Sequence, residues 1–69
     1  MDPQHLVAMV NEIAAFFAGE EAGTAAANVA NHLRRYWDPR MRRQILEHAR
    51  NGGEGLSQVA KAGVELIGR

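Results

Sequence analysis

A Trp-Asp-Pro string at residues 37–39 stands in the middle of this 69-residue chain. Proline disfavours helical geometry in the residue before it and suits the first position of a new helix. Aspartate is a preferred N-cap residue, because its carboxylate accepts a hydrogen bond from a free backbone N–H of the first turn. We therefore predict a sharp corner at Trp37–Asp38–Pro39, where one helix ends and another begins.

Apolar residues recur with helical spacing on both sides of this corner. Leu6, Val10, Ile13 and Phe17 fall within an arc of about 60° on a helical wheel. The stripe is wider than these four residues, which implies contact with more than one neighbouring helix; the residues that widen it are Met9 and Phe16 on one side and Val7 and Ala14 on the other.

No stretch of four or more residues alternates in the manner of a β-strand. We predict an all-α fold, a small bundle of four short helices. The expected ranges are residues 3–18, 21–36, 39–51 and 57–67, in a single helical domain that covers residues 1–69.

The predicted helix boundaries carry the residue types that end and begin helices. Asp2, Asp38 and Ser57 are the expected N-caps. The glycines of NGGEG (residues 51–55) are typical of a turn that stops a helix. Gly63 costs about 1 kcal/mol relative to alanine in the middle of a helix, so it indicates a close packing contact there.

Size and composition restrict how such a chain is stabilised. A core of this size supplies only a few kcal/mol net, and small domains compensate with disulfides, a metal or a partner. The chain has no Cys, which excludes disulfides, thiolate zinc sites and iron–sulfur ligation by its own residues. Its apolar runs are too short to cross a membrane and no secretory signal opens it, so we expect a cytoplasmic protein with a partner.

The formal net charge of zero hides an uneven distribution. Residues 31–50 hold six arginines against two acidic residues, a net charge of +4, and the rest of the chain holds the compensating −4. The segment around the corner also carries the only Trp and the only Tyr, and it has no Lys.

Protein interfaces are enriched in Trp, Tyr, Met and Arg and depleted in Lys. We therefore predict a partner interface with an acidic surface of another protein, because Arg forms bidentate contacts with carboxylates. In an alternative interpretation, Trp37 and Met41 belong to the core, Arg42 stacks on the indole ring and the other arginines are solvated. The two interpretations are compatible. The predicted interface residues are Arg34, Arg35, Tyr36, Trp37, Arg40, Met41, Arg42 and Arg43.

Catalysis and nucleic-acid binding are less well supported by the residues. His5, His32 and His48 lie on three different predicted helices without metal-ligand spacing, so we predict no catalytic, cofactor-binding or metal-binding residue. A helix-turn-helix-like nucleic-acid-binding module is disfavoured, because the arginines diverge around the helices and the sequence pI is about 6.8. It is kept as an alternative, together with a self-associating regulatory module, and homodimerisation of the isolated chain is left open.

Three segments together resemble one protein family: LVAMVNEIAAFF (residues 6–17), VANHLRRYWDPRMRRQIL (residues 29–46) and GGEGL (residues 52–56). In this order they are similar to the delta subunit of NAD-dependent formate dehydrogenase. The WDPRMR string (residues 37–42) is the most specific part. Where the family often caps its last helix with Asp-Pro, this chain has Ser57–Gln58.

The resemblance implies a small, non-catalytic accessory subunit of a soluble, cytoplasmic formate dehydrogenase. In such complexes the catalytic alpha subunit oxidises formate, and the complex carries molybdopterin-bound molybdenum or tungsten, iron–sulfur clusters and FMN, and uses NAD. The delta subunit is expected to hold no cofactor. Its implied role is to bind the alpha subunit and to support assembly, stability or cofactor insertion.

Overall fold

Four helices make up the regular structure of the chain. The computed structural model describes residues 2–68, and its helices are α1 (Pro3–Phe16), α2 (Ala22–Tyr36), α3 (Pro39–Arg50) and α4 (Gln58–Ile67). Residues 2–68 contain no β-strand, and the predicted all-α bundle is confirmed. The first helix ends two residues earlier than predicted, because the N–H groups of Phe17 and Ala18 bond in the tighter i→i−3 pattern to the carbonyls of Ala14 and Ala15.

Three of the helices begin at a side chain that accepts a hydrogen bond from the first turn. Asp2 Oδ1 accepts from the N–H of Gln4 at 3.0 Å, and Asp38 Oδ1 accepts from the N–H of Met41 at 2.9 Å. Ser57 caps α4 in the same way. The helix α2 begins after Glu21 without a side-chain cap.

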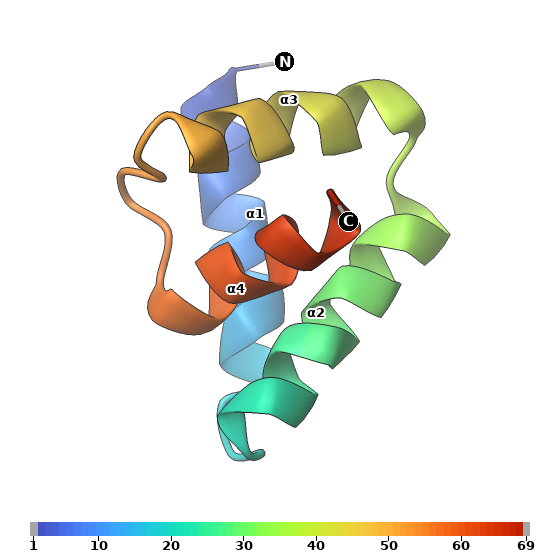
Figure 1. Ribbon diagram of the computed structural model, residues 1–69, viewed down its shortest axis with the longest axis vertical. Helices are drawn as coiled ribbons and strands as arrows, with labels where there is room; N and C mark the ends of the chain where they lie inside the picture. Colours follow the sequence, from blue (N-terminus) through green and yellow to red (C-terminus); the bar gives the residue numbers. More distant parts are fainter. Residues whose placement is uncertain (1, 69) are drawn as a thin grey trace.

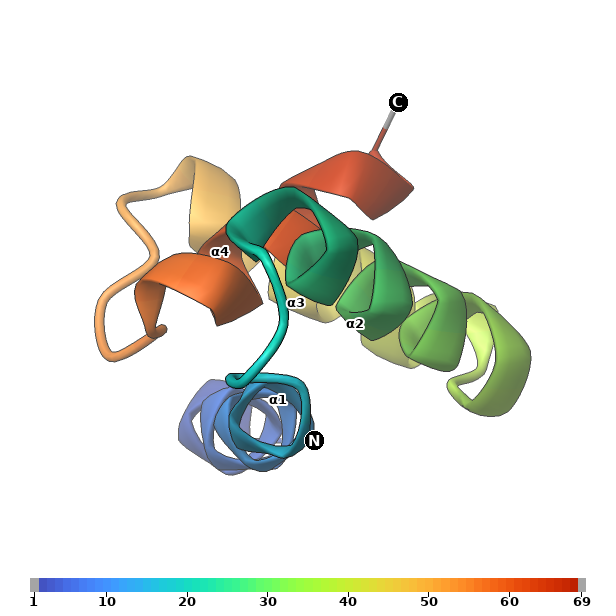
Figure 2. The ribbon, with the colours of Figure 1, turned by 90° about the horizontal axis from the view of Figure 1, so that it is seen from below.

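The helices cross one another instead of lying parallel (Figure 1). α3 runs across one end of the molecule, in front of the N-terminal part of α1 and above the C-terminal end of α2, and α4 lies in front of α1 and beside α2. Seen along the perpendicular direction, α1 stands apart on one side, while α2 and α4 lie together on the other (Figure 2). None of the helices within residues 2–68 combines the length and the apolar character needed to cross a bilayer.

The contact between α2 and α4 depends on small side chains. A Cβ atom at Gly63 of α4 would lie 2.5 Å from Cγ1 of Val29 and 3.1 Å from the carbonyl oxygen of Ala26. Only a residue without a side chain fits at this distance, so the close contact predicted from Gly63 is confirmed. Ala25 and Ala30 of α2 are also fully buried.

One apolar core connects all four helices. The buried residues of α1 are Leu6, Val7, Val10 and Ala14, so the inward face is rotated towards the Val7 side of the predicted stripe. Phe16, on the opposite side of the stripe, is 82% exposed. The other buried apolar residues of this cluster are Val29, Leu33, Trp37, Ile45, Ala49, Ala60 and Val64.

The segment between α3 and α4 is attached to α1 by one side chain. Gly53 adopts a positive φ of 64°, and its N–H bonds to the carbonyl of His48 at 3.0 Å, which closes the end of α3 as the glycines of this turn predict. Further along, Asn11 Nδ2 donates to the carbonyl of Gly55 at 2.8 Å, and Asn11 Oδ1 accepts from the N–H of Ser57 at 2.9 Å. The start of α4 is therefore fixed against α1.

Candidate docking surface

Two residues of the predicted interface hold the corner from inside. Trp37 is 6% exposed and belongs to the apolar core. Met41 is half-buried and packs against the same core. Their position agrees with the interpretation that both are core residues, and the indole of Trp37 does not form part of the outer surface.

Two of the predicted arginines bond to the main chain. Arg42 Nη1 donates to the carbonyl of Trp37 at 2.5 Å and to the carbonyl of Arg34 at 3.2 Å. Both carbonyls lie at the C-terminal end of α2, where helical carbonyls lack partners within the helix and a positive charge is favourable. Arg42 therefore closes the end of α2 from the first turn of α3. Arg34 in turn donates through Nη2 to the carbonyl of Leu66 in α4 at 2.8 Å.

The four remaining residues of the predicted interface face outward. Tyr36 is 69% exposed. Arg35, Arg40 and Arg43 are also exposed, and within residues 2–68 their side chains make no hydrogen bond or ion pair. Arg40 and Arg43 border a shallow hollow of about 530 Å³ beside Asp38 and Pro39. We call Arg35, Tyr36, Arg40 and Arg43 the outer corner.

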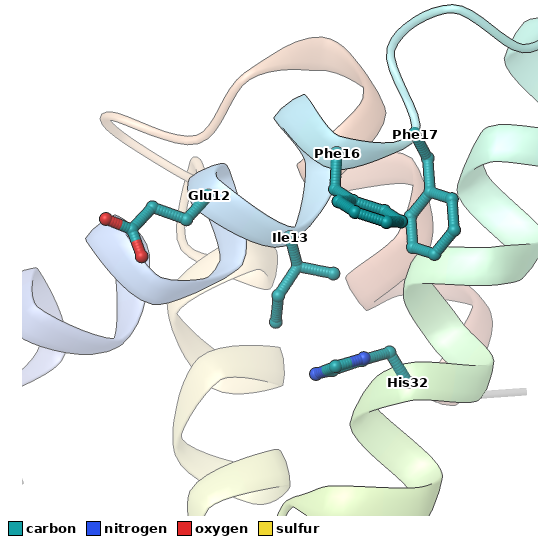
Figure 3. Close-up of a pocket in the computed structure, with 5 residues that line it drawn as sticks. All are labelled: Glu12, Ile13, Phe16, Phe17 and His32. Carbon is teal, nitrogen blue, oxygen red and sulfur yellow. The ribbon is translucent and has the colours of Figure 1, made fainter.

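A second feature of the surface is an apolar groove between α1 and α2. It has a volume of about 310 Å³, and we call it the α1–α2 groove; its lining residues are Glu12, Ile13, Phe16, Phe17 and His32. Figure 3 shows Ile13 of α1 directed towards His32 of α2, with the two phenylalanine rings side by side and Glu12 pointing away from them.

The aromatic rings connect the groove to the outer corner. The rings of Phe16 and Phe17 meet edge to face with centroids 5.1 Å apart. The rings of His32 and Tyr36 are 4.8 Å apart, so the exposed Tyr36 of the outer corner contacts a residue of the groove lining. The residues of the groove were not predicted as an interface. The sequence signal was the excess width of the α1 stripe at Met9 and Phe16.

The histidines of the chain lie at separate places. His32 lines the groove, and Nε2 of the half-buried His48 is 2.8 Å from the carbonyl oxygen of Glu54. His5 is exposed near the start of α1. Within residues 2–68, no three His, Cys, Asp or Glu side chains come together in a group that could bind a metal ion.

Comparison with known proteins identifies the family. A sequence model described as NADH-dependent formate dehydrogenase delta subunit, FdsD, matches residues 5–64. The chain belongs to the FdsD family. The match covers both the outer corner and the α1–α2 groove, and it confirms the resemblance seen in the WDPRMR string. No curated protein and no solved structure matches the chain. The features described above are therefore those of a formate dehydrogenase delta subunit.

Proposed function

We propose that this chain is a non-catalytic accessory subunit that binds the catalytic alpha subunit of a cytoplasmic, NAD-dependent formate dehydrogenase. In this proposal the outer corner is the contact surface. The chain supports assembly, stability or cofactor insertion in a molybdenum- or tungsten-containing complex, whose metal, iron–sulfur clusters and FMN belong to other subunits. Membership of the FdsD family supports the association with formate dehydrogenase.

The observation that carries the proposal is that only some of the arginines of the corner are bonded to the protein itself. Arg34 and Arg42 are bound to main-chain carbonyls, whereas Arg35, Arg40 and Arg43 are exposed and unpaired within residues 2–68. Three unpaired arginines and one exposed Tyr within residues 35–43 are residue types that are enriched in binding hot spots. Their natural complement is a carboxylate-rich surface, because each guanidinium can bind a carboxylate with two parallel hydrogen bonds.

The rigidity of the corner also favours binding. The cap formed by Asp38, the buried Trp37 and the bonds of Arg42 fix the backbone that carries Arg40 and Arg43. A backbone that is already ordered loses less conformational entropy on association, so more of the contact energy appears as affinity. This is the property expected of a small subunit that docks as a rigid body.

Co-purification tests the proposal directly. The formate dehydrogenase complex is expressed with and without the affinity-tagged chain, and we expect the tagged chain to retain the alpha subunit. We expect the complex made without it to have less bound molybdenum or tungsten and less formate-dependent NAD reduction. Full metal content and activity without the chain would contradict the assembly role, and failure to retain the alpha subunit would contradict the binding role.

A pair of variants assigns the contact to the outer corner. Arg40→Gln together with Arg43→Gln removes two exposed charges without touching the core, and we expect retention of the alpha subunit to fall. Arg50→Gln removes an exposed charge at the other end of the same helix and serves as the control. Equal retention by all three proteins would show that the outer corner is not used.

A further inference from the structure

The α1–α2 groove has a large aromatic side chain at its edge that is mostly exposed to solvent. Phe16 is 82% exposed although it lies among apolar neighbours, and the groove that it lines is formed mainly by Ile13, Phe17 and the ring of His32. A small domain gains stability from every apolar side chain that it buries. Exposed apolar surface that is rimmed by polar residues is a common feature of protein interaction sites.

The charges beside the groove restrict what that molecule is. Arg35 follows His32 by three residues, so the two are neighbours on the surface of α2. Tyr36, whose ring packs on His32, belongs to the outer corner together with Arg40 and Arg43. The acidic residues of the combined surface are Glu12 in the groove lining and Asp38 beside Arg40 and Arg43, so with three exposed arginines its net charge is +1.

A second copy of this chain fits this surface poorly. In a two-fold symmetric dimer the same patch meets itself, so two sets of exposed arginines would approach one another. Like charges brought together across an interface disfavour a complex. A partner with carboxylates next to an apolar side chain meets the same surface with opposite charge.

We propose that the α1–α2 groove receives one large apolar side chain from a segment of the partner subunit, and that this segment carries carboxylates that pair with Arg35 and the outer corner. The proposal rests on the proposed function, because the segment belongs to formate dehydrogenase. It extends the contact surface from the corner onto α1, with Phe16 as the anchor and Arg35 as the arginine that follows the groove residue His32 on α2.

The test is a titration of the full chain against the formate dehydrogenase complex purified without its delta subunit. Phe16→Ser removes the anchor at a position that is already exposed, so the fold is retained. We expect it to weaken binding at least tenfold, as truncation of an interface hot spot does.

Arg35→Glu is expected to weaken binding and to reduce its dependence on salt concentration, since one pair of opposite charges is lost. Ala27→Ser, at an exposed position of α2 outside the groove lining, is the control and is expected to bind as the unchanged chain does.

Each outcome separates this proposal from the proposed function. If the unchanged chain binds and Phe16→Ser binds equally well, the groove is not used, although the proposed function stands. If the unchanged chain does not bind the complex, both proposals are wrong. If sedimentation shows that the free chain dimerises and that Phe16→Ser is monomeric, a second copy occupies the groove and the acidic partner segment is wrong.

Discussion

Gly63 of α4 and Val29 of α2 are packed so closely that a Cβ at position 63 would lie 2.5 Å from Cγ1 of Val29. Val29 is completely buried and branched at Cβ, so its side chain has few alternative rotamers. The carbonyl oxygen of Ala26 would stand 3.1 Å from the same Cβ, and this backbone atom cannot move aside without moving α2. The separation between α2 and α4 is therefore set by the absence of a side chain at position 63.

Gly63→Ala should lower the free energy of unfolding, although alanine is the better helix former by about 1 kcal/mol. We expect a net loss of about 1–3 kcal/mol, because the added methyl group overpacks the α2–α4 contact. Urea unfolding followed by circular dichroism measures it. Gly23→Ala is the matched control, since the nearest atom to its Cβ is Glu21 Oε1 at 3.9 Å. It should leave stability unchanged or raise it by up to about 1 kcal/mol. A Gly63→Ala variant that gains stability in the same way would contradict the close contact.

The neighbouring aromatic residues Trp37 and Tyr36 should respond to truncation in opposite ways. Trp37 is 6% exposed and Tyr36 is 69% exposed. Trp37→Ala should cost about 3–5 kcal/mol, which is comparable to the total stability of a domain of this size, so we expect loss of the helical circular dichroism signal. Tyr36→Ala should change the free energy of unfolding by less than about 1 kcal/mol. A folded Trp37→Ala variant would show that the indole contributes little to the core.

Arg42 and Arg43 are adjacent in sequence, but replacing each of them with glutamine should change the free energy of unfolding by different amounts. Arg42→Gln removes the bonds to the carbonyls of Trp37 and Arg34, so we expect the free energy of unfolding to fall by about 1–2 kcal/mol. Arg43→Gln removes the same charge from an exposed position, and stability should stay within about 0.5 kcal/mol. The free energies of unfolding of the two variants are measured by thermal unfolding at the same ionic strength and compared. Equal losses would mean that the bonds of Arg42 to the main chain do not stabilise the corner.

The sequence was sufficient to predict features that depend on local chemistry. The Asp38–Pro39 pair placed the corner, because capping and the geometry of proline act on adjacent residues. Helical spacing placed the four helices, and an unfavourable glycine in mid-helix pointed to the contact at Gly63. In each case a residue type is favoured or disfavoured by neighbours within one helical turn.

The partners of contacts between residues far apart in the sequence were not predicted. The bond from the guanidinium of Arg34 to the carbonyl of Leu66, 32 residues away, is one example. Phe16 was counted in the apolar stripe of α1, but the direction from which α2 approaches leaves it outside the core. The crossing angles of the helices decide both cases, and side-chain spacing along one helix does not specify them.

Asn11 gives the clearest test of such a long-range contact. Its amide donates to the carbonyl of Gly55 and accepts from the N–H of Ser57, so one side chain satisfies two backbone groups of the segment between α3 and α4. Asn11→Ala leaves both groups without this partner, and we expect the free energy of unfolding to fall by about 1–3 kcal/mol. Asn11→Asp keeps the acceptor for Ser57 but loses the donor to Gly55 at neutral pH, when the carboxylate is ionised.

Urea unfolding measures the global loss in both variants, and hydrogen exchange at residues 53–57 should show faster local opening before global unfolding. Glu12→Ala, at an exposed position of the same helix that faces the α1–α2 groove, should change neither quantity. Unaltered exchange in Asn11→Ala would mean that the core contacts of Leu56 and Val59 alone hold this segment against the bundle.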